Sequence, residues 1–421
     1  MDFLKRCNGS TLCYFTKRCQ RACFSALAYK GLLPESMMDL AYGSTSHTVR
    51  RIAPQIPSRR SCTTTLIQEQ PKSKRELPQF VQQHLDRLQL EVTGALAGTA
   101  NDVISFGVHR PAGAVETPSN KISFELQEMA KYYFSQGGKL YRPTVALLMA
   151  ASCSHDRMLE TVSENQYKIA VVSEMIHTAS LVHDDVIDES DTRRNRPTVN
   201  ALWGNKMAVL VGDYILAKAT QLLCSIGNAQ VVSIMAQIIE DLVKGEFMQM
   251  GVRDSSSEAR FLHYMQKTYK KTASLFANSC KSVAVLAGCN ENIQRTAFEY
   301  GKNLGMAFQL IDDLLDFVAQ SATLGKPAGA DLKLGLATAP VLFAAREYPE
   351  LDRLILRRFS ESNDVQKAWD FVLNSDGLRQ TRQLARQHCE EAARLIAFLP
   401  NSAHFGEHLT DLAMSQLDRE H

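Results

Sequence analysis

The sequence has no uninterrupted run of about 18 apolar residues, the length that a transmembrane helix needs, so no membrane span is predicted. Its ten cysteines include no CxxC pair, and five of them lie within residues 1–62. This distribution argues against a disulfide framework and against a zinc site. Runs that alternate apolar and polar residues between turn signals are also scarce, so strands are not expected.

Net charge is small as well, at +2 for 421 residues. The positive charge is concentrated at the start, because residues 1–60 contain ten Lys or Arg and only three Asp or Glu. The remainder of the chain is therefore mildly acidic. A mildly acidic body gives no reason to expect nucleic acid as a partner.

Segment 1–62 is basic, rich in Ser and Thr, and interleaves apolar side chains such as Phe3 and Leu4 with Lys5 and Arg6. This composition predicts a mitochondrial transit peptide, and the lack of a clean apolar core argues against a secretory signal. A tail without a targeting role is the alternative.

Residues 76–421 are predicted to form one domain. Apolar residues recur with helical spacing, and Gly and Pro separate the segments, as at Gly137-Gly138 and Pro400. The predicted fold class is all-α, a large single-domain helical bundle. Segment 94–120 is rich in Gly, Ala, Thr and Pro and is predicted to be a long loop insertion. The predicted helices cover 76–93, 121–136, 142–153, 163–188, 205–226, 229–250, 258–287, 291–319, 336–347, 363–374, 376–398 and 403–418.

Two aspartate-rich motifs carry the chemistry. They are Asp184-Asp185-Val186-Ile187-Asp188 and Asp312-Asp313-Leu314-Leu315-Asp316. In each, the first and last Asp are four residues apart and share one face of an apolar helix, where like charges repel. A bound cation would relieve that repulsion. Oxygen-only ligands favour a hard ion such as Mg²⁺, which takes one or two carboxylates and completes its shell with water and phosphate oxygens.

Basic residues accompany the motifs. Lys139 and Arg142 lie at a Gly-rich turn before a helix, a favourable place for an anion, and Arg193-Arg194 follow the first motif. Lys271-Thr272 and Lys326 are weak signals taken alone. His177 lies seven residues before Asp184, on nearly the same helix face, and is either a diphosphate ligand or a hydrogen-bonded core residue.

With these motifs and the stretches EMIHTASLVHDDVID, IIEDLVKGEF, KKTASLFANSCK, FQLIDDLLDF and DLKLGLATAPVLFA, the chain resembles the trans-polyprenyl diphosphate synthases over roughly 120–420. The resemblance implies an isoprenoid-synthase bundle that condenses several isopentenyl diphosphates onto an allylic diphosphate, with two or three Mg²⁺ ions, to make the ubiquinone side chain.

The resemblance also implies residue roles. Asp184, Asp185, Asp188, Asp312, Asp313 and Asp316 would be catalytic, with Asp184, Asp188 and Asp312 as metal ligands. Lys139, Arg142, His177 and Arg194 would bind isopentenyl diphosphate, while Arg193, Lys271, Thr272, Gln309 and Lys326 would contact the allylic diphosphate.

The chain departs from the family pattern at two positions. Leu140 replaces an Arg that often follows Lys139, and Leu336 replaces a Lys. These departures suggest a second homologous subunit, in a heteromer or a homodimer. The matrix face of the inner membrane is the expected location, with peripheral contact to the membrane because the product is so apolar.

Ala179 and Ser180 precede Asp184 by about one helical turn, and the growing tail would pass them. Small side chains at both positions leave room for a long product, so they are predicted to set chain length. The alternative is that Ala179 only fills space between helices.

Three other classes are disfavoured. An HD-type metal phosphohydrolase would use His183-Asp184 but would give the second aspartate motif no role. A terpene cyclase usually lacks paired motifs and the GGKxxRP turn. A non-catalytic scaffold subunit would be free to lose Asp184 and Asp312, yet both are present.

Overall fold

The computed structural model describes residues 76–97, 118–135, 138–154, 162–194, 196–250, 256–318 and 329–419. The chain separates into two units, Met1–Arg75 and Glu76–His421, and every described residue belongs to the second. The predicted transit peptide therefore lies outside the described residues.

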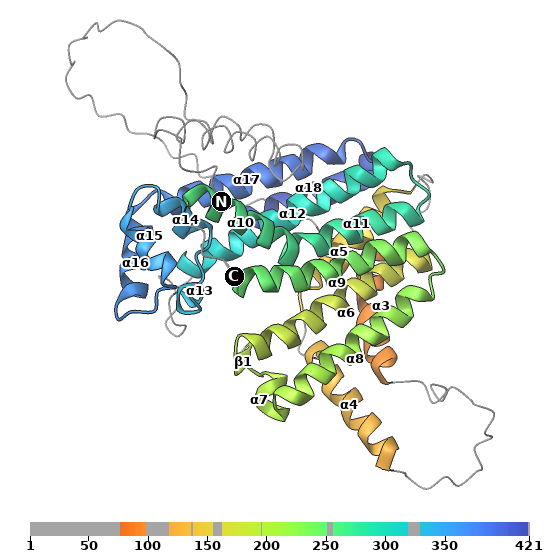
Figure 1. Cartoon of the computed structure of the whole chain (residues 1–421). Helices are drawn as coiled ribbons and strands as arrows, with labels where there is room; N and C mark the ends of the chain where they lie inside the picture. The colour runs from red at the N-terminus through yellow and green to blue at the C-terminus, as the bar shows by residue number, and fades with distance from the viewer. Residues whose placement is uncertain are drawn as a thin grey trace, which may run out of the picture. The chain divides into compact units, whose positions relative to one another are not determined.

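The described part is built from helices (Figure 1). They are α3 (Gln79–Ala97), α4 (Pro118–Ser135), α5 (Tyr141–Ser152), α6 (Glu164–Ile187), α7 (Val199–Trp203), α8 (Asn205–Cys224), α9 (Ala229–Met250), α10 (Ser257–Thr268), the π-helix η2 (Tyr269–Ala273), α11 (Ser274–Leu286), α12 (Glu291–Val318), α13 (Ala330–Lys333), α14 (Ala339–Ala344), α15 (Glu350–Leu356), α16 (Asp364–Asn374), α17 (Gly377–Ile396), α18 (Ser402–Met414) and the 3₁₀ turn η3 (Ser415–Asp418). Strands β1 (Thr192–Arg193) and β2 (Arg196–Pro197) form a two-residue antiparallel hairpin.

The long helices pack around a large apolar core, and a second buried cluster that includes Phe317 and Leu332 lies among α12 to α16. α11 lies between the two motif-bearing helices, since it contacts both α6 and α12, and α12 also packs along α17. The core includes Leu147, Ile169 and Phe276, each at most 1% exposed. Each fully buried side chain of this size stabilises the fold by about 1.5–3 kcal/mol. These helices form a rigid frame for the aspartates that they carry.

Local sequence fixes where α6 begins. The Ser163 side chain accepts a hydrogen bond from the Gln166 backbone N–H at 3.3 Å, and the Gln166 side chain accepts from the Ser163 N–H at 3.1 Å. This reciprocal capping box satisfies two N–H groups that helix geometry leaves unpaired. It sets the start of the helix whose far end carries Asp184 and Asp188.

Glycines bring α12 close to its neighbours. A Cβ at Gly301 would lie 2.5 Å from the Phe276 carbonyl oxygen, and one at Gly305 would lie 2.5 Å from the Ala273 Cα. Neither distance is compatible with a side chain, so only glycine permits this approach. The approach places Gln309 and the second aspartate motif against η2.

The all-helical prediction is confirmed, with local differences. The predicted helix 258–287 is divided by η2, and the short helices α7, α13 and α15 were not predicted. No strand was expected, yet the short β1–β2 hairpin forms. α3 extends to Ala97 and α4 begins at Pro118, so the centre of the predicted loop, 98–117, lies outside the described residues.

One helix in the described part, α8, is long and apolar enough to cross a membrane by length and composition, and only 33% of its most apolar window is buried. No span was predicted from the sequence, because it has no uninterrupted run of about 18 apolar residues, and Asp213 and Lys218 lie within α8. Its exposed apolar side chains include Val209 and Leu210.

Candidate active site

The first aspartate motif ends α6. Asp184 is partly buried, and burial raises the pKa of its carboxyl to about 6, opposed by the nearby Lys271. Asp188 is the C-terminal cap of α6, and its N–H donates to the Asp184 carbonyl at 2.8 Å. Burial raises the pKa of Asp188 too, and Lys271 again opposes the shift. Both carboxylates thus share two cationic neighbours, Lys271 and Arg193.

The second motif lies near the end of α12. Burial raises the pKa of Asp312 to about 6, although Arg419 beside it lowers the value. The two carboxylate oxygens of Asp316 accept hydrogen bonds from the Ala330 and Asp331 N–H groups at 3.1 and 3.2 Å. Asp316 therefore caps α13 and ties it to the motif.

The middle aspartates are the most buried members of their motifs. Asp185 is 1% exposed and Asp313 is 3% exposed. Arg193 donates to Asp185, with its Nε 2.9 Å from Oδ1, and Gln309 Nε2 donates to Asp313 Oδ1 at 2.8 Å. Because Thr272 Oγ1 donates to Gln309 at 2.7 Å, Gln309 is itself held in place.

Two lysines connect the motifs. The positive charge of Lys271 lowers the pKa values of Asp184 and Asp188. Lys267 lies close to Lys271 and to Asp313, and both of them affect the pKa of the Lys267 ammonium group. Burial lowers the pKa of Lys267, and Lys271 lowers it further. The two carboxylate sets therefore border one region that also contains two ammonium groups.

Lys271 lies in the π-helix η2, and its side chain extends toward α9. Its ammonium forms an ion pair with the buried Glu246 of α9 and lies 3.2 Å from Gln249 Oε1. A Cβ at Gly245 would lie 2.7 Å from Lys271 Cγ, so the glycine gives room for the lysine stem. π-helical turns of this kind are frequent at functional sites.

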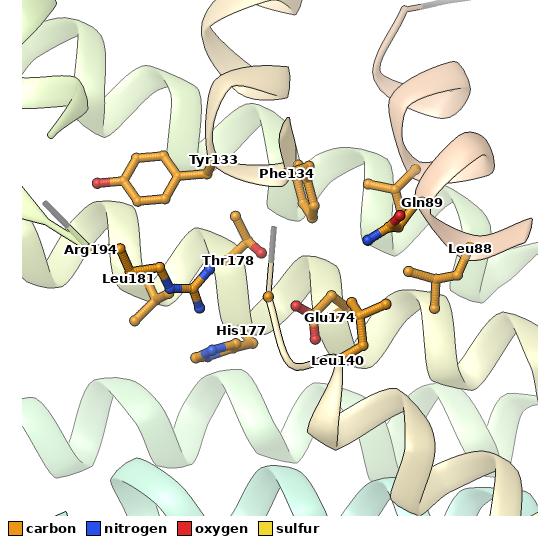
Figure 2. A pocket seen from close by; sticks show the side chains of 12 residues that line it. Leu88, Gln89, Tyr133, Phe134, Leu140, Glu174, His177, Thr178, Leu181 and Arg194 are labelled. Carbon is orange, nitrogen blue, oxygen red and sulfur yellow. The ribbon is translucent and has the colours of Figure 1, made fainter. Parts of the chain in front are cut away.

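A second cationic region lies beside α6, where Arg194, His177 and Glu174 face a small cavity of about 30 Å³ (Figure 2). Burial raises the pKa of Glu174, with Arg142 and Arg194 opposing the shift, and burial lowers the pKa of His177. Neutral His177 and the guanidinium groups of Arg142 and Arg194 would favour the binding of an anion such as a diphosphate.

Arg142 is also close to the second motif. Burial lowers its pKa, whereas Glu174 and Asp312 raise it. Its guanidinium carbon lies 5.1 Å from the centre of the Phe276 ring, and its Nε is buried without a hydrogen-bond partner. A buried, incompletely satisfied guanidinium is suited to receive a ligand oxygen.

The structure brings most of the predicted residues together. Asp184, Asp188 and Asp312 border the two cationic regions described above, which contain Arg142, His177, Arg193, Arg194, Lys271, Thr272 and Gln309. Lys139 is exposed at the turn before α5, and Lys326 lies outside the described residues. Ala179 is fully buried in the core, and Ser180 donates to the His177 carbonyl at 2.8 Å. His183 is turned toward α8, with Nε2 3.2 Å from the Val209 carbonyl oxygen, which favours a structural role.

Sequence reasoning missed several residues here, namely Tyr133, Glu174, Glu246, Tyr264, Lys267, Asp331 and Arg419. Glu174, Glu246 and Asp331 lie within the stretches that carry the family resemblance. For Glu174 and Glu246, a charged residue inside an apolar helix was the available signal. The other four are recognised only from contacts between distant segments.

The donor set fits Mg²⁺. Asp184, Asp188 and Asp312 offer hard carboxylate oxygens under like-charge repulsion. In the described ranges, no three His, Cys, Asp or Glu side chains gather closely enough to hold a metal ion by themselves. That arrangement suits an ion that completes its shell with water and diphosphate oxygens rather than with protein groups alone.

An all-helical bundle with paired carboxylate motifs and two cationic regions defines a diphosphate-processing enzyme of the prenyl type. The polyprenyl synthetase family model matches residues 124–372, and the chain belongs to that family. The predicted family, fold class and prenyltransferase class are thereby confirmed.

Individual relatives agree with this assignment. All trans-polyprenyl-diphosphate synthase PDSS1 of Homo sapiens is 54% identical over 65% of this chain and 66% of its own length. Solanesyl-diphosphate synthase 1, mitochondrial, of Oryza sativa subsp. japonica is 46% identical over 66% of this chain and 67% of its own length. The chain thus matches about two thirds of each relative.

A solved structure is also similar. The polyprenyl synthase from Caulobacter crescentus CB15, complexed with calcium and isoprenyl diphosphate, has a TM-score of 0.67 and 29% identity. The superposition covers 81% of this chain and 96% of that one. That relative binds a divalent cation and an isoprenyl diphosphate in the same fold.

Proposed function

We propose that this chain is a Mg²⁺-dependent trans-polyprenyl diphosphate synthase that adds several isopentenyl diphosphates to an allylic diphosphate to make the long side chain of ubiquinone. The observation that carries the proposal is the pair of aspartate motifs beside two distinct cationic regions. A condensation of two diphosphate substrates needs two anion sites next to one metal site. The two cationic regions would be the anion sites, and the aspartate motifs would form the metal site.

The region around Lys271, Thr272, Gln309 and the hairpin residue Arg193 would bind the allylic diphosphate. Asp184 and Asp188 on one side and Asp312 on the other would hold two or three Mg²⁺ ions. When bound there, Mg²⁺ supplies positive charge that stabilises the departing diphosphate. The ammonium of Lys271 adds to this stabilisation once it turns from Glu246 to the substrate.

The second region would bind isopentenyl diphosphate through Arg142, Arg194, His177 and the exposed Lys139. Orientation is the main contribution of this site, since it holds the isopentenyl double bond near C1 of the allylic partner. The allylic C1–O bond breaks, the double bond attacks C1, and a proton is then lost, with the departing diphosphate as its acceptor. No covalent enzyme intermediate is required.

Product length would be set along α6 below Asp184. Ala179 and Ser180 are small, and each added isoprene unit would bury five carbons at about 0.8 kcal/mol per CH₂ or methyl group. An apolar path along this face therefore favours long products.

A homologous subunit would cover an apolar face of the enzyme. Large apolar side chains are exposed on α7, α8 and the C-terminal part of α9: Leu202, Trp203, Val209, Leu210, Val243, Phe247 and Met250. Leu336, where the family often has Lys, is a second reason to expect a partner that completes the site. We place the enzyme in the mitochondrial matrix, in line with the mitochondrial name of the rice relative.

The test is product analysis of the full chain with farnesyl diphosphate and labelled isopentenyl diphosphate, with and without EDTA. A long polyprenyl product that disappears with EDTA would support the proposal. The same assay with added mitochondrial extract, combined with light scattering, separates a self-sufficient homodimer from a chain that needs a different subunit. A folded protein without product under all of these conditions would contradict the proposed function.

A further inference from the structure

The two aspartate motifs share an arrangement that their sequences do not show. In each, the middle carboxylate accepts a hydrogen bond from a tyrosine hydroxyl on another helix. Tyr133 of α4 donates to Asp185 Oδ2, and Tyr264 of α10 donates to Asp313 Oδ2 at 2.5 Å. Both tyrosine side chains are buried, at 6% and 3% exposure. Burial raises the pKa of both phenols, so they remain protonated donors.

Each middle aspartate also has a second side-chain donor. Arg193 contacts Asp185, with its Nη2 2.8 Å from Oδ1, and Gln309 donates to Asp313 Oδ1 at 2.8 Å. Each carboxylate is therefore held from two directions by side chains of different segments. Figure 2 shows the Tyr133 ring at the edge of the cavity with its hydroxyl turned away from the cavity centre.

Helix geometry explains what this tether does. At about 100° per residue, the first and last aspartates of DDxxD lie about 40° apart around the helix, whereas the middle one lies about 100° from the first. A middle carboxylate fixed to the neighbouring helix therefore sets the rotation of the motif. That rotation determines whether the outer carboxylates face the shared region.

We propose that Tyr133 and Tyr264 are matched positioning residues that lock Asp185 and Asp313 away from the metal and so aim Asp184, Asp188 and Asp312 at the ions and diphosphate. The proposal rests on the proposed function and assigns the middle aspartates to anchoring. Support of ligands by outer hydrogen bonds is general at metal sites, and its loss costs about 10- to 100-fold in metal affinity or activity.

The experiment uses the full chain with Tyr133→Phe and Tyr264→Phe, which delete only the hydroxyl. Tyr132→Phe is the matched control, because it deletes the hydroxyl of the adjacent tyrosine on α4, which donates to the Pro197 carbonyl at 2.9 Å. Mn²⁺ binding is titrated in the presence of inorganic diphosphate, and the Mg²⁺ concentration for half-maximal turnover is measured alongside kcat. Thermal unfolding reports whether each variant is folded.

Both lock variants are expected to weaken Mn²⁺ binding and to raise the Mg²⁺ requirement by about tenfold, while the control stays within about twofold. If Tyr133 acts through Asp185, Tyr133→Phe has little further effect in an Asp185→Ala background. Unchanged Mn²⁺ and Mg²⁺ dependence in both folded lock variants would overturn the proposal, as would an equal loss in the control.

The two motifs provide independent tests. If either Tyr133→Phe or Tyr264→Phe fails to fold, the other variant still tests the proposal. The Mn²⁺ titration needs no turnover. Absence of polyprenyl product from the wild-type chain would therefore contradict the proposed function, while the titration would still decide the role of the tyrosines.

Discussion

Arg419 forms an ion pair with Asp312, with Nη2 2.7 Å from Oδ1. Its guanidinium carbon also lies 4.2 Å from the centre of the Phe308 ring. A residue that follows the last helical turn of the described chain thus reaches a predicted metal ligand. Burial raises the pKa of Asp312 and Arg419 opposes the rise, so the ion pair helps to keep this carboxylate ready for a metal ion.

Replacing Arg419 is expected to shift the pH profile. In Arg419→Gln, the pKa of Asp312 rises further because its cationic neighbour is gone. The acid limb of kcat/KM for the allylic substrate should therefore move to higher pH. Arg394→Gln is the control, since Arg394 pairs with Glu391 on the exposed surface. Ionisation of the substrate affects wild type and both variants equally, so the test is the shift found only in Arg419→Gln. An acid limb that stays at the wild-type pH in Arg419→Gln would contradict the contact between Arg419 and Asp312.

Magnesium dependence should itself vary with pH. Asp184 and Asp312 have pKa values of about 6, raised by burial, and only their ionised forms bind Mg²⁺. Since a carboxyl group one pH unit below its pKa is about one-tenth ionised, the Mg²⁺ concentration for half-maximal activity should rise about tenfold between pH 7 and pH 5. Measurement at fixed ionic strength tests this. A Mg²⁺ requirement that is flat over that interval would show that these carboxylates are not ligands.

Asp331 should lower the stability of the metal-free enzyme at high pH. Burial and the neighbouring Asp313 and Asp316 raise its pKa to about 8 from an ordinary 3.8. The folded state therefore disfavours the ionised form, and this destabilisation grows as pH rises from about 4 to about 8. In EDTA, Asp331→Asn should raise the Tm more at pH 8 than at pH 5. Asp86→Asn, on the exposed face of α3, should show no such difference, and an equal gain at both pH values for Asp331→Asn would be the contrary result.

Chain length should respond to bulk at Ala179. A phenyl group there would project along the path predicted for the growing tail, so Ala179→Phe is expected to give shorter products at a similar initial rate. Ala170→Phe is the matched control, because Ala170 is equally buried on α6 but nine residues earlier, on the opposite helix face. Product sizes are compared by chromatography. Unchanged length in a folded Ala179→Phe enzyme would assign Ala179 to helix packing.

The sequence was informative wherever chemistry is local. The long helices α6 and α12 follow from their apolar periodicity, and the aspartate motifs were visible because residues four apart share a helix face. Helices α13 and α15 were missed since segments of four and seven residues are too short to establish a period.

Contacts between segments that are far apart in the sequence could not be predicted from local patterns. Nothing in the residues around Tyr264 indicates that its hydroxyl meets Asp313, because that contact depends on how α10 packs beside α12. Arg419 is similar, for its approach to Asp312 requires the whole chain to fold first. The sequence therefore predicts candidate ligands of the site but not the side chains that contact them.

Asp184 is the residue on which the proposed metal site depends most directly. The decisive measurement is the rate at which full-length wild type, Asp184→Asn and Asp213→Asn convert farnesyl diphosphate and labelled isopentenyl diphosphate into polyprenyl product with Mg²⁺. Asp213 is an exposed carboxylate on α8 and serves as the control. We predict that Asp213→Asn retains the wild-type rate and that Asp184→Asn loses about 100- to 1,000-fold, the scale of losing one preorganised charge-stabilising group. A folded Asp184→Asn enzyme that elongates within about twofold of wild type would contradict the account.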